Sequence, residues 1–176
     1  MAVSKGMLEI LSTALGMEEK GMAFYREAVD VCANKAASEI FKTLHDDEVV
    51  HVERIRKIFV EVQAGRAMDD AWKSNRITHS DLGGIFRGLA RKYGSEIRQA
   101  AKDVAAVDVG LEFELKSVSF YMEWMGKVTD VQERRFLAAM VSEEQEHHSA
   151  LADLKFYLTD PAGWFNEKEH STLDGA

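Results

Sequence analysis

Residues 17–25 (MEEKGMAFY) and 46–51 (DDEVVH) contain a pattern that returns 96 positions later, in residues 111–121 (LEFELKSVSFY) and 142–147 (SEEQEH). At this offset glutamates, tyrosines and histidines coincide: Glu18 with Glu114, Tyr25 with Tyr121, Glu48 with Glu144, and His51 with His147. Each half therefore reads Glu-x6-Tyr and then Glu-x-x-His. Apolar positions also coincide at this offset, as in Leu11 and Val107 or Ile58 and Leu154. This repeat predicts a duplicated helical hairpin that carries a two-metal site.

The spacing of apolar residues around these motifs predicts four long helices. They cover approximately residues 4–33, 36–64, 95–127 and 131–157. The only proline is Pro161, so no proline interrupts any of them. The junctions near Asn34 and Asp130 are only a few residues long, which forces the helices on either side to run antiparallel.

A long connection, approximately residues 65–94, separates the two hairpins. It is rich in glycine and turn-forming residues and has a predicted short helix near residues 85–92. Two hairpins joined by a long crossover are typical of the ferritin-like bundle. We therefore predict an all-α, ferritin-like four-helix bundle over residues 1–160. The tail, residues 161–176, is predicted to be irregular and to pack on the bundle through Trp164 and Phe165.

Composition narrows the class of protein. The net charge of −8 over 176 residues argues against binding to nucleic acid or to anionic membranes. The first residues resemble the start of an amphipathic helix and not a signal peptide, and no apolar run approaches the roughly 18 residues of a membrane span. The single cysteine, Cys32, excludes an internal disulfide and a Cys-x-x-Cys module. We expect a soluble, cytoplasmic protein.

In a helical Glu-x-x-His motif, the two side chains lie on one face about 5–6 Å apart at Cβ, so both can reach one metal ion. Two such motifs, with one further glutamate from each partner helix, give four carboxylates and two imidazoles. Four carboxylates neutralise two divalent ions, and this mixed oxygen and nitrogen ligation suits iron or manganese. The predicted ligands are Glu18, Glu48, His51, Glu114, Glu144 and His147.

A Glu-x-x-His motif can occur by chance, because 18 glutamates and six histidines give roughly 0.6 random matches in a chain of this length. A third match, Glu167 to His170, falls in the tail and receives no role. Two matches in register with two Glu-x6-Tyr motifs are far more specific. Without a metal, four glutamates meeting in a core would repel one another or become protonated.

Other residues near the motifs also have predicted roles. Tyr25 and Tyr121 lie two turns after Glu18 and Glu114, where they either pack in the core or donate a hydrogen bond to a ligand carboxylate. His148 is predicted to contact a ligand or to lie at the surface, and Cys32 is predicted to be a small buried side chain. Several neighbouring acids are predicted to lie on solvated faces: Glu19, Asp46, Asp47, Glu112, Glu143 and Glu146.

With these motifs, the sequence resembles the rubrerythrin-like branch of the ferritin-like superfamily over roughly 130 residues. The tail stretch PAGWFNEKEH, followed by LDG, resembles a segment found after the fourth helix in such proteins. The resemblance implies a non-haem site of two iron ions per chain, held by the six predicted ligands, with manganese or zinc as alternative occupants. It also implies binding of peroxide or dioxygen between the metals. No catalytic residue beyond the ligands is predicted.

Two features depart from the family pattern. Rubrerythrins proper carry a rubredoxin domain that holds one iron on four cysteines, and this chain has one cysteine. Their third helix offers an extra glutamate one turn before the main one, where this chain has Leu111. That glutamate is tied to efficient peroxide reduction, so its absence leaves a more symmetric six-ligand site.

Three functions follow as hypotheses. The first is a di-iron oxidoreductase, relevant to oxidative stress, that reduces hydrogen peroxide or oxygen with electrons from an external donor such as a rubredoxin. The second is ferritin-like iron handling, by ferroxidation, storage or delivery. The third is a metal-stabilised structural or sensing bundle. The long helices also predict a homodimer.

Overall fold

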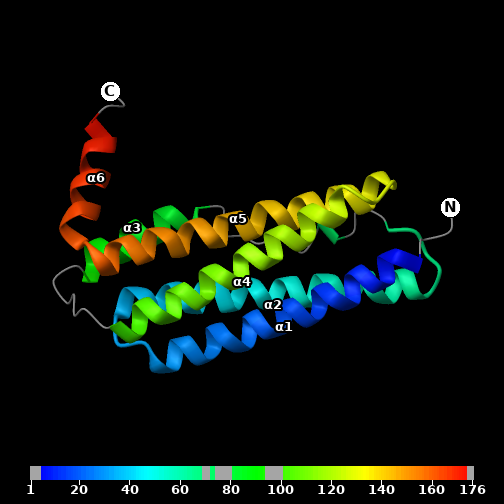
Figure 1. Ribbon diagram of the computed structural model, residues 1–176, viewed down its shortest axis with the longest axis horizontal. Helices are drawn as coiled ribbons and strands as arrows, with labels where there is room; N and C mark the ends of the chain where they lie inside the picture. Colours follow the sequence, from blue (N-terminus) through cyan, green and yellow to red (C-terminus); the bar gives the residue numbers. More distant parts are fainter. Residues whose placement is uncertain (1–4, 69–71, 74–80, 94–100, 174–176) are drawn as a thin grey trace.

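The described residues of the computed structural model, 5–68, 72–73, 81–93 and 101–173, form six α-helices (Figure 1). Their bounds are α1 Lys5–Val31, α2 Lys35–Gln63, α3 Leu82–Tyr93, α4 Ala101–Met125, α5 Val131–Thr159 and α6 Pro161–Leu173. The all-α class is confirmed. The four long helices lie within a few residues of the predicted bounds, although the predicted start of the third, residues 95–100, is outside the described residues.

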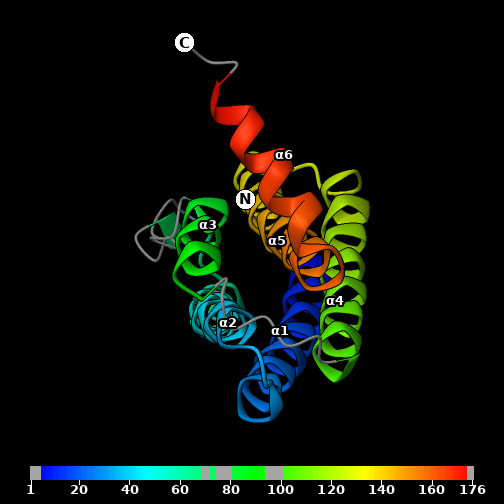
Figure 2. The ribbon, with the colours of Figure 1, turned by 90° about the vertical axis from the view of Figure 1, so that its left-hand side faces the viewer.

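The four long helices pair as two hairpins, α1 with α2 and α4 with α5 (Figure 2). The hairpins meet through α1 against α4 and α2 against α5, and α3 lies against both α2 and α5. This arrangement is consistent with a ferritin-like helical bundle. Its helical axes run together, so side chains from all four long helices converge along one central core.

Both hairpins begin their second helix in the same way, at two residues 96 positions apart. The Asn34 side chain caps α2 by accepting a hydrogen bond from Ala37 N at 3.0 Å. The Asp130 carboxylate caps α5 by accepting from Gln132 N at 2.7 Å. Such caps satisfy backbone donors that the first helical turn leaves unpaired. The duplication therefore includes the turns that set each hairpin.

One carboxylate ties the first hairpin to the second. Asp103, on α4, is buried and accepts hydrogen bonds from the backbone N–H groups of Ala33 at 3.1 Å and Asn34 at 2.9 Å. These donors lie in the turn between α1 and α2, where no helix supplies partners for them. Asp103 thus fixes the N-terminal end of α4 against this turn.

Two apolar clusters fill the bundle, one on each side of the repeated motifs. On α2, Leu44 belongs to the first cluster and Ile55 to the second. On α5, Met140 belongs to the second cluster and Leu151 to the first. The Glu-x-x-His motifs lie between these positions on both helices. The motifs are therefore enclosed along the bundle axis by apolar side chains.

The tail differs from its prediction, because residues 161–173 form a helix and not an irregular segment. The Asp160 side chain accepts a hydrogen bond from Gly163 N at 2.9 Å, and Pro161 occupies the first helical position, where its missing N–H costs nothing. Trp164 is buried against Phe86 and Tyr157. Beyond it, α6 leads away from the bundle (Figure 1).

The third Glu-x-x-His match, which begins at Glu167, lies in α6, and the side chain of His170 is outside the described residues. Among the helices described, none has both the length and the apolar character needed to cross a bilayer.

Candidate metal centre

The six predicted ligands lie together in the middle of the bundle. Glu18 comes from α1, Glu114 from α4, and each Glu-x-x-His pair from α2 or α5. Every one of the six is at most 3% exposed. Ionisable side chains are almost never buried to this extent unless they are paired or bind a metal.

The six side chains form two overlapping groups, in each of which the potential ligand atoms lie within 4.8 Å of one another. We name the first the His51 position, made of Glu18, Glu48, His51 and Glu144, and the second the His147 position, made of Glu48, Glu114, Glu144 and His147. Glu48 and Glu144 belong to both. A carboxylate has two oxygens, so these two residues can bridge a pair of ions.

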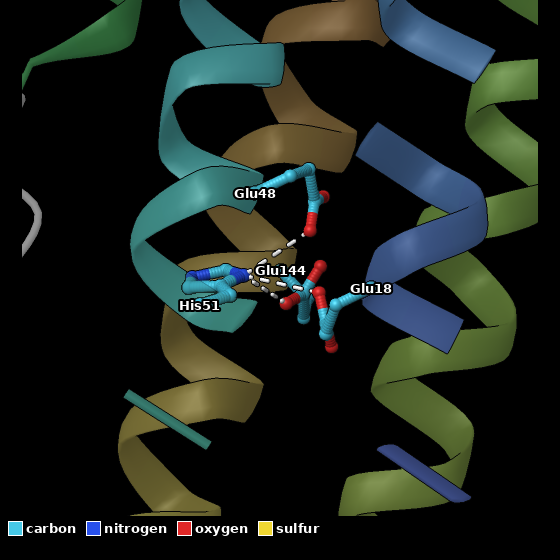
Figure 3. Close-up of side chains that lie close together, drawn as sticks. All are labelled: Glu18, Glu48, His51 and Glu144. Carbon is cyan, nitrogen blue, oxygen red and sulfur yellow. Dashed lines mark hydrogen bonds and ion pairs between the residues drawn. The ribbon is translucent and has the colours of Figure 1, made fainter. Parts of the chain in front are cut away.

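Both imidazoles direct Nδ1 towards the glutamates. At the His51 position, Nδ1 lies 3.1 Å from Glu144 Oε1 and 3.2 Å from Glu18 Oε2 (Figure 3). At the His147 position, Nδ1 lies 3.6 Å from Glu144 Oε2 and 3.7 Å from Glu114 Oε2. The two rings stack with their centroids 5.4 Å apart.

The unbonded atoms of the cluster are those that a metal would use. Among the described residues, Glu48 Oε2, both Glu144 carboxylate oxygens and His147 Nδ1 are buried without a hydrogen-bond partner. These atoms lie in ion pairs but make no hydrogen bonds, which is costly in a core, whereas coordination of a cation would satisfy them. Four carboxylates and two imidazoles suit iron or manganese better than a metal that seeks thiolates. The residues present therefore fit a pair of divalent cations.

The two tyrosines hold one glutamate each across the bundle. Tyr25 on α1 donates a hydrogen bond to Glu114 on α4, and Tyr121 on α4 donates one to Glu18 on α1. Burial, together with the nearby carboxylates, raises the pKa of both phenols well above the usual value, so they stay protonated as donors. Both rings also pack in the apolar clusters. Core packing and hydrogen bonding to a proposed ligand were predicted as alternatives for the two tyrosines, and both are found.

Two acids predicted to be solvated lie at the site instead, so that prediction was wrong for them. Glu143 Oε2 lies 3.1 Å from His51 Nε2 and accepts its hydrogen bond, and Asp47 Oδ2 lies 3.5 Å from His147 Nε2. Each contacts the histidine of the other hairpin, across the bundle, which the position of a residue on its own helix does not reveal. A signal was present, since Asp47 and Glu143 are themselves 96 positions apart.

Sequence reasoning also missed Arg54, which is 1% exposed in the core. Its Nη1 donates to Glu143 Oε2 at 2.6 Å and its Nη2 to Glu143 Oε1 at 3.3 Å. Arg54 follows His51 by three positions and therefore lies on the same face of α2. A charged residue on that apolar face was the available signal.

The remaining predictions for nearby polar residues agree better with the structure. Asp46, Glu112 and Glu146 are exposed, and Glu19 forms a surface ion pair with Arg56. His148 is half-buried. Cys32, in contrast, was predicted to be buried and is only half-buried, and this partial burial raises the pKa of its thiol to about 12.

In the metal-free protein, burial and neighbouring charges shift the pKa values of five of these groups in different directions. Burial, reinforced by Glu144, raises the pKa of Glu114 to about 8, and burial with Glu18 raises the pKa of Glu48 well above its usual value. Burial opposes charge on His51 and His147, but the surrounding carboxylates outweigh it and raise both pKa values well above the usual one. Burial also opposes charge on Glu144, yet the two histidines lower its pKa well below the usual value.

These shifts predict that metal-free protein loses stability as the pH rises from about 5 to about 8. Glu114 has an ordinary pKa of 4.5 and keeps its proton to about 8 when folded, so over this range the unfolded state releases a proton that the folded state retains. The raised histidine pKa values act in the same direction above 6.5. The lowered pKa of Glu144 gives stability that is lost only on acidification below 4.5.

Thermal unfolding of metal-free protein between pH 5 and 8.5 checks this prediction. We expect the Tm to fall by at least about 5 °C. Each unit by which the pKa of a group in the folded protein exceeds its ordinary value corresponds to about 1.4 kcal/mol of stability, and the Tm of a domain of this size changes by roughly 2–4 °C per kcal/mol. A Tm that rises over this range would contradict the arrangement of charges described above.

Comparison with known families supports a metal-binding role for this site. The family model described as Rubrerythrin matches residues 9–82, which contain Glu18, Glu48 and His51. This first hairpin is therefore similar to a rubrerythrin domain, consistent with a rubrerythrin-like protein of the ferritin-like class. Comparison with curated proteins and with solved structures gives no match. The family match and the buried carboxylate–histidine cluster together suggest a di-iron type of metal site.

Proposed function

We propose that this protein is a non-haem di-iron oxidoreductase that reduces hydrogen peroxide, or oxygen, with electrons from an external donor. The observation that carries the proposal is the pair of buried carboxylate–histidine groups that share Glu48 and Glu144. Glu18 and His51 would complete one iron position, and Glu114 and His147 the other. Two irons per chain are part of the proposal, with manganese or zinc as alternative occupants.

The chemistry of peroxide reduction matches what such a pair supplies. Two ferrous ions, when bound, supply the two electrons and the Lewis acidity for H₂O₂ + 2H⁺ + 2e⁻ → 2H₂O. The chain itself fixes the terminal carboxylates, because Tyr25 holds Glu114 and Tyr121 holds Glu18. Such partners keep ligands oriented and are worth 10- to 100-fold in metal affinity or activity at comparable sites.

Burial of the site favours a small oxidant as substrate. All six proposed ligands are at most 3% exposed, and apolar clusters enclose them along the bundle axis. Peroxide and dioxygen are small enough to reach a centre of this kind, whereas a bulky organic substrate is not. This enclosure also limits the access of bulk water to the proposed metals.

Electrons must then come from outside the bundle. A rubredoxin-type centre needs four cysteines, and the sequence contains only Cys32. We therefore include a separate donor, such as a rubredoxin, in the proposal. The homodimer expected from the long helices also stays a prediction, and the exposed Leu115 and Met122, one heptad apart on α4, are compatible with it.

Iron handling is the second candidate, and one observation favours it. Leu111, and not a further glutamate, lies one turn before Glu114 on α4, so the ligand set is the same in both halves. A symmetric set lacks the extra carboxylate that the resemblance links to efficient peroxide reduction. In that case iron would be the substrate of the site, and uptake would continue beyond two ions.

Anaerobic titration of metal-free protein with Fe(II), followed by stopped-flow mixing with peroxide or with oxygen, tests the proposal. We expect two irons per chain, faster oxidation by peroxide than by oxygen, and renewed reduction by a rubredoxin. Oxidation by oxygen with uptake well beyond two irons would instead favour storage. Absence of binding would overturn the di-iron proposal altogether. In the same titration, Glu112→Ala removes an exposed carboxylate from α4 and should behave as the unsubstituted protein, because Glu112 is not a proposed ligand.

A further inference from the structure

The two halves of the metal centre differ in what stands behind each histidine. The residue 96 positions after Arg54 is Ala150, which is also buried. Behind His51 there is therefore a carboxylate paired with a guanidinium, whereas alanine replaces the guanidinium in the other half. This is a break in a repeat that otherwise preserves the ligands, their tyrosine partners and the helix caps.

The contacts of the two rings follow this difference. His51 Nε2 donates to Glu143 at 3.1 Å, and both Glu143 oxygens accept hydrogen bonds from Arg54. His147 Nε2 lies 3.5 Å from Asp47 Oδ2, which has no hydrogen-bond partner among the described residues. The Nε2 side of the His51 ring is thus anchored through a chain of hydrogen bonds, whereas the Nε2 side of the His147 ring faces Asp47 without one.

Burying Arg54 is costly, which makes its presence informative. A buried guanidinium loses hydration that its partner must replace, and apolar replacement of buried ion pairs is often neutral or stabilising. In the opposite half, the equivalent position of the repeat is occupied by the small apolar residue Ala150, which is also buried. Packing alone therefore does not explain Arg54, which also donates to Met140 Sδ at 3.4 Å. Its two hydrogen bonds to Glu143 hold that carboxylate in place, because planar guanidinium groups fix carboxylates in orientation.

Two effects on metal binding compete, and the distances decide between them. A carboxylate without a cation beside it makes a hydrogen-bonded imidazole a stronger ligand, which would favour His147. However, Asp47 Oδ2 lies 3.5 Å from that ring without a hydrogen bond to it, so this effect is weaker than the one that Glu143 exerts on His51 at 3.1 Å. Orientation of His51 by a fixed partner then dominates.

We propose that Arg54, by holding Glu143 against the His51 ring, makes the His51 position the first of the two to bind a divalent cation. Arg54 is a positioning residue, since it acts through Glu143 and its guanidinium pairs with that carboxylate. The His147 position then fills second and more weakly. This inference rests on the proposed metal centre, though not on peroxide as the substrate.

Titration of metal-free protein with Co(II), followed by calorimetry and visible absorption, tests this order. We expect two resolved steps in the unsubstituted protein. Arg54→Met should weaken the first step by roughly 10- to 100-fold and leave the second step unchanged. Arg54→Lys, which keeps the positive charge, should weaken the first step less than Arg54→Met does. Arg56→Met, which makes the same change at an exposed position on the same helix, is the control and should alter neither step. Equal steps, or equal weakening of both in Arg54→Met, would overturn the proposal.

A second measurement needs no change at Arg54, in case that variant fails to fold. With one equivalent of Co(II), the imidazole N–H of the coordinated histidine gives a paramagnetically shifted proton signal. We expect this signal to move in Glu143→Gln and to stay in place in Asp47→Asn. The reverse result would show that the His147 position fills first and would overturn the proposal. If Co(II) does not bind at all, the metal centre itself is refuted, which separates the two failures.

Discussion

Loading metal-free protein with Fe(II), without oxygen and with free Fe(II) at about 100 times the Kd of each site, is expected to raise its Tm by about 10–20 °C. A ligand present at 100 times its Kd stabilises the folded state by about 2.7 kcal/mol, so two sites contribute about 5 kcal/mol. For a chain of this length, each kcal/mol shifts the Tm by roughly 2–4 °C. The large effect arises because cations would replace the protons that Glu48 and Glu114 hold in the core and would relieve the repulsion among the four buried carboxylates.

Differential scanning calorimetry at fixed pH measures this shift, and two comparisons make it specific. Mg(II) keeps much of its water and prefers all-oxygen ligands, so it should give a clearly smaller shift than Fe(II) or Mn(II). Removal of bound iron with a chelator should return the Tm to its original value. Equal shifts for Mg(II) and Fe(II) would indicate non-specific binding to the acidic surface and not coordination in the core.

The sequence predicted the bundle and its central site because both depend on spacing within single helices. Glu48 and His51 lie three positions apart, so their convergence follows from helical geometry alone. The 96-residue repeat then placed Glu144 and His147 in the equivalent position on the other hairpin. Short junctions at Asn34 and Asp130 fixed the antiparallel pairing. None of these inferences required knowledge of how one hairpin contacts the other.

The site residues that the sequence did not predict are those whose role depends on contacts between the two hairpins. Asp47 and Glu143 each lie next to a ligand on their own helix but contact the histidine of the opposite hairpin, which only the packing of α2 against α5 reveals. Arg54 was overlooked because a charged residue on an apolar face needs partners, and Glu143, which pairs with it, is on another helix. The helical tail was a different error, since Asp160 and Pro161 together form a local helix-start signal.

Glu144→Ala is expected to abolish binding of the ion pair and, with it, the proposed peroxide reduction. Glu144 belongs to both metal positions, its two oxygens are buried without hydrogen bonds among the described residues, and it lies within 3.6 Å of both histidines. Its lowered pKa also keeps Glu144 ionised and able to receive a cation. The loss of affinity should exceed the roughly 100-fold upper range seen when partners of ligands are removed.

The design of this experiment separates loss of a ligand from loss of the fold. Glu146→Ala removes a carboxylate two positions away on the same helix, where it is exposed, and should retain both ions and the full Fe(II)-induced rise in Tm. Glu18→Ala leaves the His147 position complete and should weaken binding less than Glu144→Ala does. Circular dichroism establishes whether each variant is helical, and Glu144→Gln replaces Glu144→Ala if the latter unfolds. A folded Glu144→Ala protein that still bound two irons tightly would refute a shared carboxylate at the centre, because no other bridging ligand except Glu48 is common to both positions among the described residues.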